Sequence, residues 1–391
     1  VGTPGATKLN QFNNIPEGAV LVQSDEDRLY LMYTVPGAGT LYKGLPLRMF
    51  YEVKSNDLYK AGILTQDAPY EINLFLTEEE ILVKVVSNSI CMSTYKATIL
   101  GKNHKRVPND CDVNPIITGH EFAGKIIKVG KMWQDQFKAG EKFGIQPALN
   151  YKGSMDSPGY SFPWYGGNMT YAVIPKEVME INCLINYSGD AYFEASLAEP
   201  MSCVIGGFHA SYHIKPSTYN HIMDIKKGGS LAILGGCGPM GMGAIDYAIH
   251  RDIKPKTIVV TDISDDRINR AKQILTVEEA KNNGVDLHYV NPNNYENPIE
   301  YIKGLNNESG FDDVMVYVPI KALVEQADLL LGKDGCMNFF AGPIDSKFSS
   351  EINMYNIHYQ ATKIIGSTGG NTDDMLESLD MTSKGLINPA V

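Results

Sequence analysis

Three glycines follow a short apolar run, and their spacing suits the binding of a dinucleotide. The run Ser230–Leu234 leads to Gly236, Gly238 and Gly241, which occupy the three places of the pattern G-x-G-x-x-G. The first glycine permits a tight turn, the second lets the backbone approach a pyrophosphate, and the third lets helix and strand pack closely. The N-terminus of the helix would face the anion. The pattern therefore predicts a strand, a glycine turn and a helix that bind a dinucleotide.

A carboxylate further along the chain strengthens this prediction. Asp262 ends the next apolar run, about 20 residues after Gly241, where it could accept hydrogen bonds from the adenosine ribose. A carboxylate there repels a 2′-phosphate, so NAD(H) is favoured over NADP(H). We include Pro239 and Met240 of the turn, and Arg267 of the following helical stretch, among the candidate cofactor-binding residues.

Four residues upstream carry the side-chain types that bind zinc, which are thiolate, imidazole and carboxylate. They are Cys91, the pair His120-Glu121, and Glu199. Taken singly, a cysteine is more often a small core residue and a His-Glu pair is more often ordinary structure. The wider pattern favours chemistry, since the following motifs come in this order before the dinucleotide loop: Cys91-Met92-Ser93, Gly119-His120-Glu121-Phe122-Ala123-Gly124 with Gly130, Gly166-Gly167 with Tyr171, and Glu199-Pro200.

In these motifs the sequence resembles the zinc-containing medium-chain dehydrogenase family, in its polyol-dehydrogenase branch, over about residues 75–391. The resemblance implies that Cys91 and His120 bind zinc, and that the carboxylates of Glu121 and Glu199 complete the coordination or alternate in it. A fourth position is left for water or substrate. Ser93 stands where the family has its proton-relay hydroxyl, and the resemblance makes Ser93 and Glu121 candidate catalytic residues. Alcohol dehydrogenases of the family have a cysteine at the place of Glu199.

Two departures from the family pattern are informative. Many members have a histidine five residues after the metal-binding cysteine; Lys96 stands there, so we count it as a candidate catalytic or substrate-binding residue. Many members also bind a second, structural zinc through four closely spaced cysteines, but the matching stretch Ile145–Tyr165 contains no cysteine. The sequence therefore predicts one catalytic zinc and no structural zinc.

The length and the changing pattern of the chain predict two domains around this chemistry. A chain of 391 residues exceeds one ordinary core. Residues 47–199 show short strands broken by turns, and the resemblance places them, with 366–391, in a GroES-like, mainly β, catalytic zinc-binding domain. Residues 200–365 alternate strand and helix, which predicts a Rossmann domain with a doubly wound parallel sheet for the dinucleotide. The expected fold class is α/β.

The two ends of the chain fit the family less well. The family's catalytic domain normally continues beyond the segment that matches Gly366–Val391, and residues 1–46 match nothing in it. We expect 1–46 to be an added N-terminal segment, left unassigned. The alternative is that it replaces the missing structure, which would be excluded if Ala19–Val22 and Leu29–Thr34 were unpaired.

The composition limits which cellular locations and which classes of partner are to be expected. A net charge of −11 argues against a nucleic-acid partner, which would require a basic face. No apolar run approaches the roughly 18 residues of a membrane span. The six cysteines form no C-x-x-C arrangement, which favours a reduced, cytoplasmic location. We also expect a homo-oligomer, either a dimer or a tetramer.

One basic run stands out in this acidic chain. Residues 101–106 carry Lys102, His104, Lys105 and Arg106 between the first two candidate metal ligands. A solvated loop is the plain interpretation. The resemblance to sugar-phosphate reductases of the polyol branch supports another one, in which Arg106, with Lys96 or Lys105, binds a substrate phosphate.

The expected activity is hydride transfer between NAD(H) and the secondary alcohol or ketone of a polyol or ketose, free or phosphorylated, with zinc as a Lewis acid. A dehydrogenase of unphosphorylated polyols or other secondary alcohols is the alternative within the same chemistry. A zinc-free dinucleotide-binding protein, such as a redox sensor, is a more distant alternative, because fold does not fix function.

Overall fold

The computed structural model describes residues 77–112, 115–162, 165–367 and 369–391 in full, together with the backbone of three strands before them. These strands are β1 (Val20–Ser24), β2 (Arg28–Thr34) and β3 (Arg48–Lys54), and they form a separate antiparallel sheet in the order β1-β2-β3. The runs expected near residues 19–22 and 29–34 are thus paired. Because these runs are paired, the alternative that residues 1–46 replace the missing structure is not excluded. The rest of that segment lies outside the described residues.

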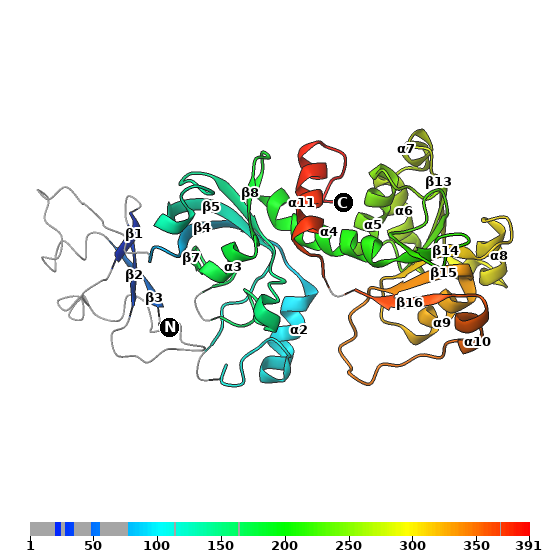
Figure 1. Ribbon diagram of the computed structural model, residues 1–391, viewed down its shortest axis with the longest axis horizontal. Helices are drawn as coiled ribbons and strands as arrows, with labels where there is room; N and C mark the ends of the chain where they lie inside the picture. Colours follow the sequence, from blue (N-terminus) through cyan, green and yellow to red (C-terminus); the bar gives the residue numbers. More distant parts are fainter. Residues whose placement is uncertain are drawn as a thin grey trace, which may run out of the picture.

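A five-stranded antiparallel sheet forms the core of the catalytic domain (Figure 1). Its strand order is β7-β4-β5-β6-β8. One face is covered by aromatic and branched side chains that are almost fully buried, including Phe122 and Phe143, whose rings meet edge to face at 6.2 Å. The strands are β4 (Ile81–Asn88), β5 (Phe122–Val129), β6 (Lys142–Ile145), β7 (Tyr171–Ile174) and β8 (Leu184–Tyr187).

Close packing between β4 and β5 requires a glycine, since a Cβ at Gly124 would lie 1.9 Å from the carbonyl oxygen of Lys84 on the neighbouring strand.

Short helices and 3-10 turns surround this sheet. The helices are α2 (Met92–Leu100) and α3 (Lys176–Glu180), with the 3-10 turns η2 (Gly101–Asn103), η3 (Lys131–Trp133) and η4 (Tyr151–Gly153).

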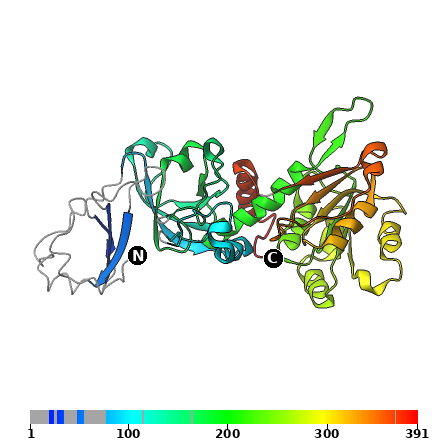
Figure 2. The same cartoon turned by 90° about the horizontal axis from the view of Figure 1, so that it is seen from below.

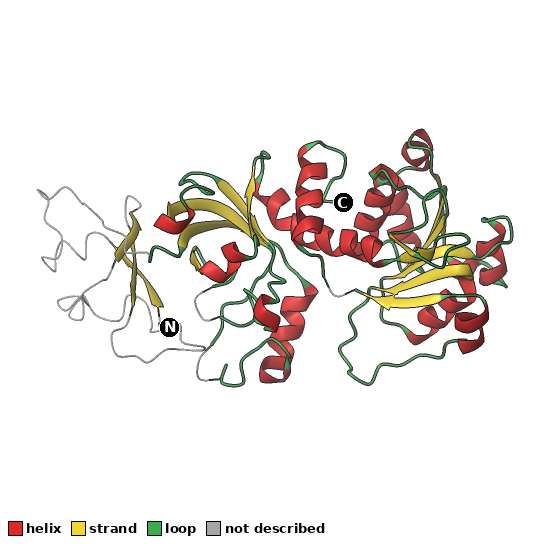
Figure 3. Cartoon of the chain, in the orientation of Figure 1, coloured by secondary structure: helices red, strands yellow, loops and turns green. Residues whose placement is uncertain are grey.

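The second domain is built on a six-stranded sheet in which every pairing is parallel, with helices on both faces (Figure 3). The central strand is buried on both sides. Leu231 and Ile233 point into one apolar core, and Ala232 and Leu234 into the other. Such two-sided burial explains why the sequence reads as a continuous apolar run rather than an alternating one. The expected Rossmann architecture is confirmed.

The strand order of this sheet is β13-β12-β11-β14-β15-β16. The strands are β11 (Ser230–Leu234), β12 (Thr257–Thr261), β13 (Asp286–Val290), β14 (Phe311–Val316), β15 (Leu331–Phe339) and β16 (Lys363–Gly366). The helices are α5 (Pro239–His250), α6 (Asp265–Ile274), α7 (Val277–Asn282), α8 (Pro298–Gly304), α9 (Lys321–Leu330) and α10 (Met354–Tyr359), with the 3-10 turn η5 (Pro292–Asn294). A hairpin of β9 (Tyr212–Ile214) and β10 (His221–Met223) projects from this domain (Figure 2).

One long helix joins the two domains. In α4 (Tyr192–Ala210), Ala195 and Ala198 pack into the core of the catalytic domain, whereas Val204 and Phe208 pack into the core of the second domain. The C-terminal helix α11 (Thr372–Ser383) lies against α4 (Figure 1). A boundary near residues 199–200 and the assignment of 366–391 to the catalytic domain stay proposals, because α4 and the C-terminal segment contact both cores.

None of the helices in the described part of the chain combines the length and the apolar character needed to cross a bilayer.

Candidate active site

The pairing of two strands brings the candidate metal ligands together. β4 ends at Asn88 and β5 begins at Phe122, and these two residues are partners in the antiparallel register. Cys91 lies just after the end of β4, and His120-Glu121 lies just before the start of β5. His120 and Glu121 directly precede β5 and follow Gly119, which has a φ of +90°. Both segments therefore leave the sheet at the same end.

Three of the four candidate ligands form one compact group. The Sγ atom of Cys91, a ring nitrogen of His120 and a carboxylate oxygen of Glu121 all lie within 4.8 Å of one another. No other group of this kind occurs among the residues that the structure describes. His120 is 5% exposed and Glu121 is 4% exposed, so both side chains are withdrawn from solvent.

Neighbouring N–H and hydroxyl groups orient the three candidate ligands. Cys91 is the N-cap of α2, and its Sγ accepts a hydrogen bond of 3.4 Å from the backbone N–H of Ser93. The Thr94 hydroxyl lies 3.2 Å from Nδ1 of His120, while Nε2 of the same ring faces Glu121 at 3.6 Å. The Ser89 hydroxyl donates to Oε2 of Glu121. Partners of this kind fix the tautomer and the direction of metal ligands.

Glu199 borders this group without belonging to the mutually close set. It is buried in α4, where its carboxyl group is hydrogen-bonded to that of Glu121 and its Oε1 accepts a hydrogen bond of 3.6 Å from Cys203 Sγ. The next residue, Pro200, lies inside the helix and lacks a backbone N–H. Glu199 thus lies next to Glu121 at the edge of the group.

Burial dominates the electrostatics of the group. It raises the pKa of the Cys91 thiol to about 12, with the Glu121 charge as a second cause, and lowers the pKa of His120 to about 4. The pKa of Glu121 is raised by burial, and that of Glu199 is raised well above its usual range by burial and by Glu121. The imidazole is therefore neutral, as a ligand must be. A buried thiol, imidazole and carboxylate form the donor set that tetrahedral zinc binds.

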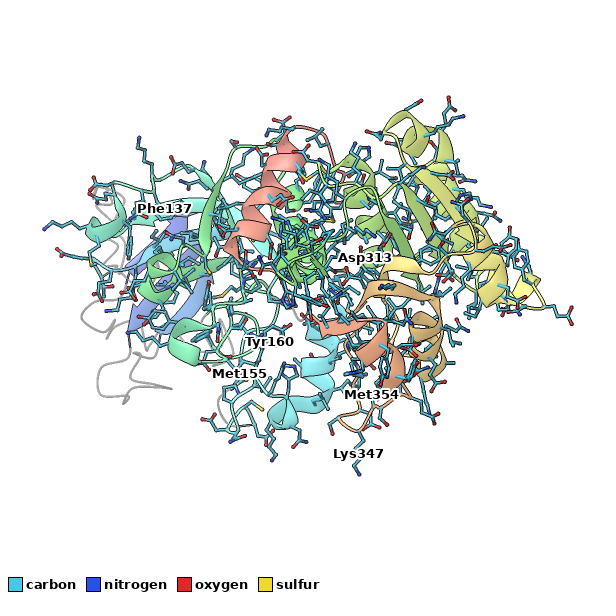
Figure 4. All side chains as sticks on the ribbon, turned by 45° about the vertical axis from the view of Figure 1, so that its right-hand side comes forward. Phe137, Met155, Tyr160, Asp313, Lys347 and Met354 are labelled. Carbon is cyan, nitrogen blue, oxygen red and sulfur yellow. The ribbon has the colours of Figure 1, made fainter. Side chains whose placement is uncertain are left out.

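Tyr160 is a further site residue that the sequence did not reveal. Its hydroxyl lies 3.2 Å from His120 Nε2, and its ring centroid lies 4.8 Å from that of His120. Tyr160 belongs to the loop that also carries Met155 (Figure 4), within the stretch singled out for its lack of cysteines. This loop approaches the candidate metal ligands closely, since a Cβ at Gly159 would lie 2.3 Å from the carbonyl oxygen of Gly119.

The two candidate catalytic residues of α2 are placed differently. The Ser93 side chain forms hydrogen bonds with Cys91 and with Tyr160, so it lies at the candidate metal ligands. Lys96 instead donates a hydrogen bond of 2.6 Å from Nζ to the carbonyl oxygen of Gly342, which follows β15 in the second domain. Lys96 thus links the two domains.

The glycine turn has the geometry that its pattern predicts. A Cβ at Gly236 would lie 2.7 Å from a methyl of Val260, and one at Gly241 would lie 2.3 Å from the carbonyl oxygen of Gly236. A Cβ at Gly238 would meet nothing within 4 Å. Gly238 is the N-cap of α5, with Pro239 at the start of the helix and Met240 and Gly241 in its first turn. The second glycine therefore presents open backbone at a helix N-terminus, as pyrophosphate binding requires.

Asp262 follows β12 next to this turn and is buried. Its Oδ1 accepts a hydrogen bond of 3.0 Å from the backbone N–H of Ser264 and lies 4.0 Å from Nη1 of Arg267. The Arg267 side chain is largely exposed, so this ion pair is weak. Asp262 is positioned by the backbone at the carboxyl edge of the parallel sheet.

Comparison with known proteins agrees with this architecture. Residues 77–182 match the model of the alcohol dehydrogenase GroES-like domain, and residues 239–384 match that of the zinc-binding dehydrogenase. The chain is 53% identical to a mannitol-1-phosphate 5-dehydrogenase from Aliivibrio fischeri, over 81% of this chain and 74% of that one. It is 46% identical to an L-sorbose 1-phosphate reductase from Klebsiella pneumoniae, over 77% of this chain and 72% of that one.

A solved structure shows the same fold. It is a zinc-binding dehydrogenase from Sinorhizobium meliloti bound to NADP, with a TM-score of 0.63, 19% identity, and coverage of 88% of this chain and 86% of that one. Together with the two domain matches and the relatives, this establishes the fold as a GroES-like domain joined to a Rossmann domain. The chain belongs to the zinc-containing medium-chain dehydrogenase family. It is an oxidoreductase of the zinc-dependent alcohol and polyol dehydrogenase class.

Proposed function

We propose that the protein interconverts the ketone of a ketose phosphate and the secondary alcohol of a polyol phosphate, with one zinc ion and NAD(H). The observation that carries the proposal is the buried group of Cys91, His120 and Glu121. The names of the two relatives support a phosphorylated sugar or polyol as the substrate. A polyol dehydrogenase that ignores phosphate is the alternative.

In this proposal Cys91 and His120 hold the zinc, and Glu121 and Glu199 complete its coordination in turn. When bound, zinc polarises the substrate oxygen and the nicotinamide carries the hydride. The hydroxyl groups of Thr94 and Ser89 hold the imidazole and the carboxylate in the required directions. One ligand set of this kind occurs in the part of the chain that the structure describes, which supports about one zinc per chain.

Ser93 and Tyr160 are the groups that we assign to proton movement. Their side chains are hydrogen-bonded to each other, and Ser93 reaches Cys91 while Tyr160 reaches His120. The Ser93 hydroxyl would therefore accept the proton of the substrate alcohol as it donates its own to Tyr160, and the Tyr160 hydroxyl would pass a proton to solvent water. Burial raises the pKa of Tyr160 above its usual range, so its hydroxyl stays neutral and acts as both donor and acceptor.

We assign NAD(H) as the preferred cofactor because Asp262 is buried beside the glycine turn. A carboxylate there binds ribose hydroxyls and repels a 2′-phosphate. We also propose a homo-oligomer, a dimer or a tetramer, and a cytoplasmic location. The location is supported by the six cysteines, none of which is paired in a disulfide.

The test is an NADH-oxidation assay on the zinc-loaded protein. The substrates are 1- and 6-phosphorylated ketoses and the matching free ketoses, each compared by kcat/KM. We expect turnover of a ketose phosphate, and its loss in Cys91→Ser, because a neutral hydroxyl is a much weaker zinc ligand than a thiolate. Turnover of free ketoses alone would leave a polyol dehydrogenase. No NADH oxidation with any of these substrates would refute the proposal.

A further inference from the structure

The cations of the basic run 101–106 have different neighbours. Lys102 forms an ion pair of 3.2 Å with Asp112, and Lys105 is exposed. Lys96, the other candidate from α2, donates to Gly342 in the second domain. Arg106 is half-buried and turns toward Tyr160, with its Cζ atom 5.8 Å from the ring centroid. Among these cations, Arg106 is therefore the one placed next to a residue that touches the metal ligands.

Most of the N–H donors of the Arg106 guanidinium are available to a ligand. Nη1 donates one long hydrogen bond of 3.4 Å to the carbonyl oxygen of Met155. Arg106 forms no ion pair with an acidic residue in the part of the chain that the structure describes. A guanidinium has five N–H donors arranged as a fork that matches phosphate oxygens. A half-buried arginine whose charge is not neutralised by a carboxylate is suited to bind an anion.

Several contacts fix the Arg106 backbone relative to the metal ligands. Its carbonyl oxygen accepts a hydrogen bond of 2.7 Å from the hydroxyl of Ser161, a fully buried residue next to Tyr160. Its N–H donates to Nδ1 of His104, whose ring stacks on Tyr160 with an interplanar angle of 9°. Val107, the next residue, packs in one apolar cluster with Tyr160. The position of Arg106 is thus set before any ligand arrives.

The positive charge of Arg106 would offset the negative charge that a substrate phosphate meets at the site. The carboxylate of Glu121 belongs to the site, and the whole chain carries a net charge of −11. A phosphate dianion would be repelled without a nearby cation. Arg106 can provide this cation, because its Cζ atom lies 5.8 Å from the ring centroid of Tyr160, whose hydroxyl is 3.2 Å from His120 Nε2.

We propose that Arg106, held against Tyr160, is the binding site for the phosphate group of the substrate, while the reacting carbon lies at the Cys91–His120–Glu121 group. This inference rests on the proposed function and deepens it. It separates the basic run into one residue that binds phosphate and others that do not. Lys96 is excluded because its Nζ atom is already bound to the second domain.

The test compares Arg106→Gln with Lys102→Gln, which removes the same charge from the same run but at a residue paired with Asp112. The readout is the ratio of kcat/KM for a ketose phosphate to kcat/KM for the free ketose, which cancels effects on zinc or NADH. We expect Arg106→Gln to lower this ratio about ten- to a hundredfold, since charged hydrogen bonds to phosphate are lost. Lys102→Gln should change it by less than about twofold.

A second readout does not depend on turnover. Inorganic phosphate, titrated by calorimetry into the protein loaded with zinc and NADH, should bind to the wild type and much more weakly to Arg106→Gln. Arg106→Lys keeps the charge but loses the fork, and we expect an intermediate ratio and intermediate phosphate affinity. It replaces Arg106→Gln as the test if the glutamine variant does not fold.

The outcomes separate the two proposals. A wild type that prefers ketose phosphate, with a ratio unchanged by both Arg106 variants, overturns the phosphate site and leaves the proposed function intact. A wild type with equal efficiency on phosphorylated and free ketose overturns the phosphate site and leaves a polyol dehydrogenase. Absence of all turnover, with calorimetric phosphate binding that depends on Arg106, supports an anion site and refutes the proposed reaction instead.

Discussion

Replacing Gly238 by alanine should separate cofactor binding from the stability of the domain that binds it. Gly238 has an extended backbone, with φ of −86° and ψ of 173°, which any residue adopts. A Cβ at this position meets nothing within 4 Å. Alanine should stabilise the fold by about 0.4–1 kcal/mol through the unfolded state, but it is a poorer N-cap than glycine, by a similar amount. We expect the free energy of unfolding to change by less than about 1 kcal/mol.

The same methyl group should weaken cofactor binding strongly. The second glycine of the pattern is the position where the pyrophosphate approaches the backbone, so a Cβ there occupies space that the cofactor needs. We expect the dissociation constant of NADH to rise about tenfold or more, which corresponds to a loss of about 1.4 kcal/mol or more of binding free energy. The measurement is a titration of NADH fluorescence, alongside thermal unfolding without cofactor.

Gly241→Ala is the matched variant, in which the added methyl group should lower the stability of the fold as well as the affinity for NADH. Its Cβ would lie 2.3 Å from the carbonyl oxygen of Gly236, and that backbone atom can move only if α5 shifts away from the turn. Overpacking of this kind costs about 1–3 kcal/mol. We expect the midpoint of thermal unfolding to fall by roughly 2–10 °C, with weaker NADH binding as well. Unchanged NADH affinity in Gly238→Ala would refute the placement of the pyrophosphate at this turn.

Three further predictions address the metal, the cofactor and the contact between the domains. Cys91→Ser should lower the zinc content from about one per chain to a small fraction in elemental analysis, and full retention of zinc would remove Cys91 from the ligand set. Asp262→Ser should narrow the preference for NADH over NADPH in kcat/KM, because the repulsion of a 2′-phosphate is lost; an unchanged preference would count against Asp262. Lys96→Met removes the hydrogen bond to Gly342 and should lower kcat/KM about two- to tenfold, equally for phosphorylated and free ketoses. A selective loss for the phosphorylated substrate would instead make Lys96 a phosphate ligand.

The sequence alone determined the features that depend on local backbone requirements. The turn Gly236–Gly241 could be recognised because each glycine meets a local backbone requirement. Gly236 and Gly241 lie in close contact with neighbouring atoms, and Gly238 leaves the backbone open. The alternation of strand and helix after residue 200 likewise predicted the parallel sheet, because a strand buried on both faces leaves a continuous apolar run. The four candidate metal ligands were identifiable from their types and their order.

The tertiary structure decided which of these residues meet. Cys91 and His120 approach each other because Asn88 pairs with Phe122, a register that no local pattern specifies. Glu199 comes from a helix that spans both domains, and so it borders Glu121 without joining the mutually close group. The order of the candidate ligands along the chain does not specify the distances between them in space.

The basic run shows the same limit most clearly. Lys96, Lys102 and Arg106 are equivalent as charges in the sequence, but their neighbours are a carbonyl of the second domain, an aspartate and the ring of Tyr160. Tyr160 itself had no signal, since one aromatic residue in a loop has no periodicity from which its contacts could be inferred. Charge and residue type are properties of the sequence, whereas the direction of a long side chain depends on packing between segments far apart in the chain.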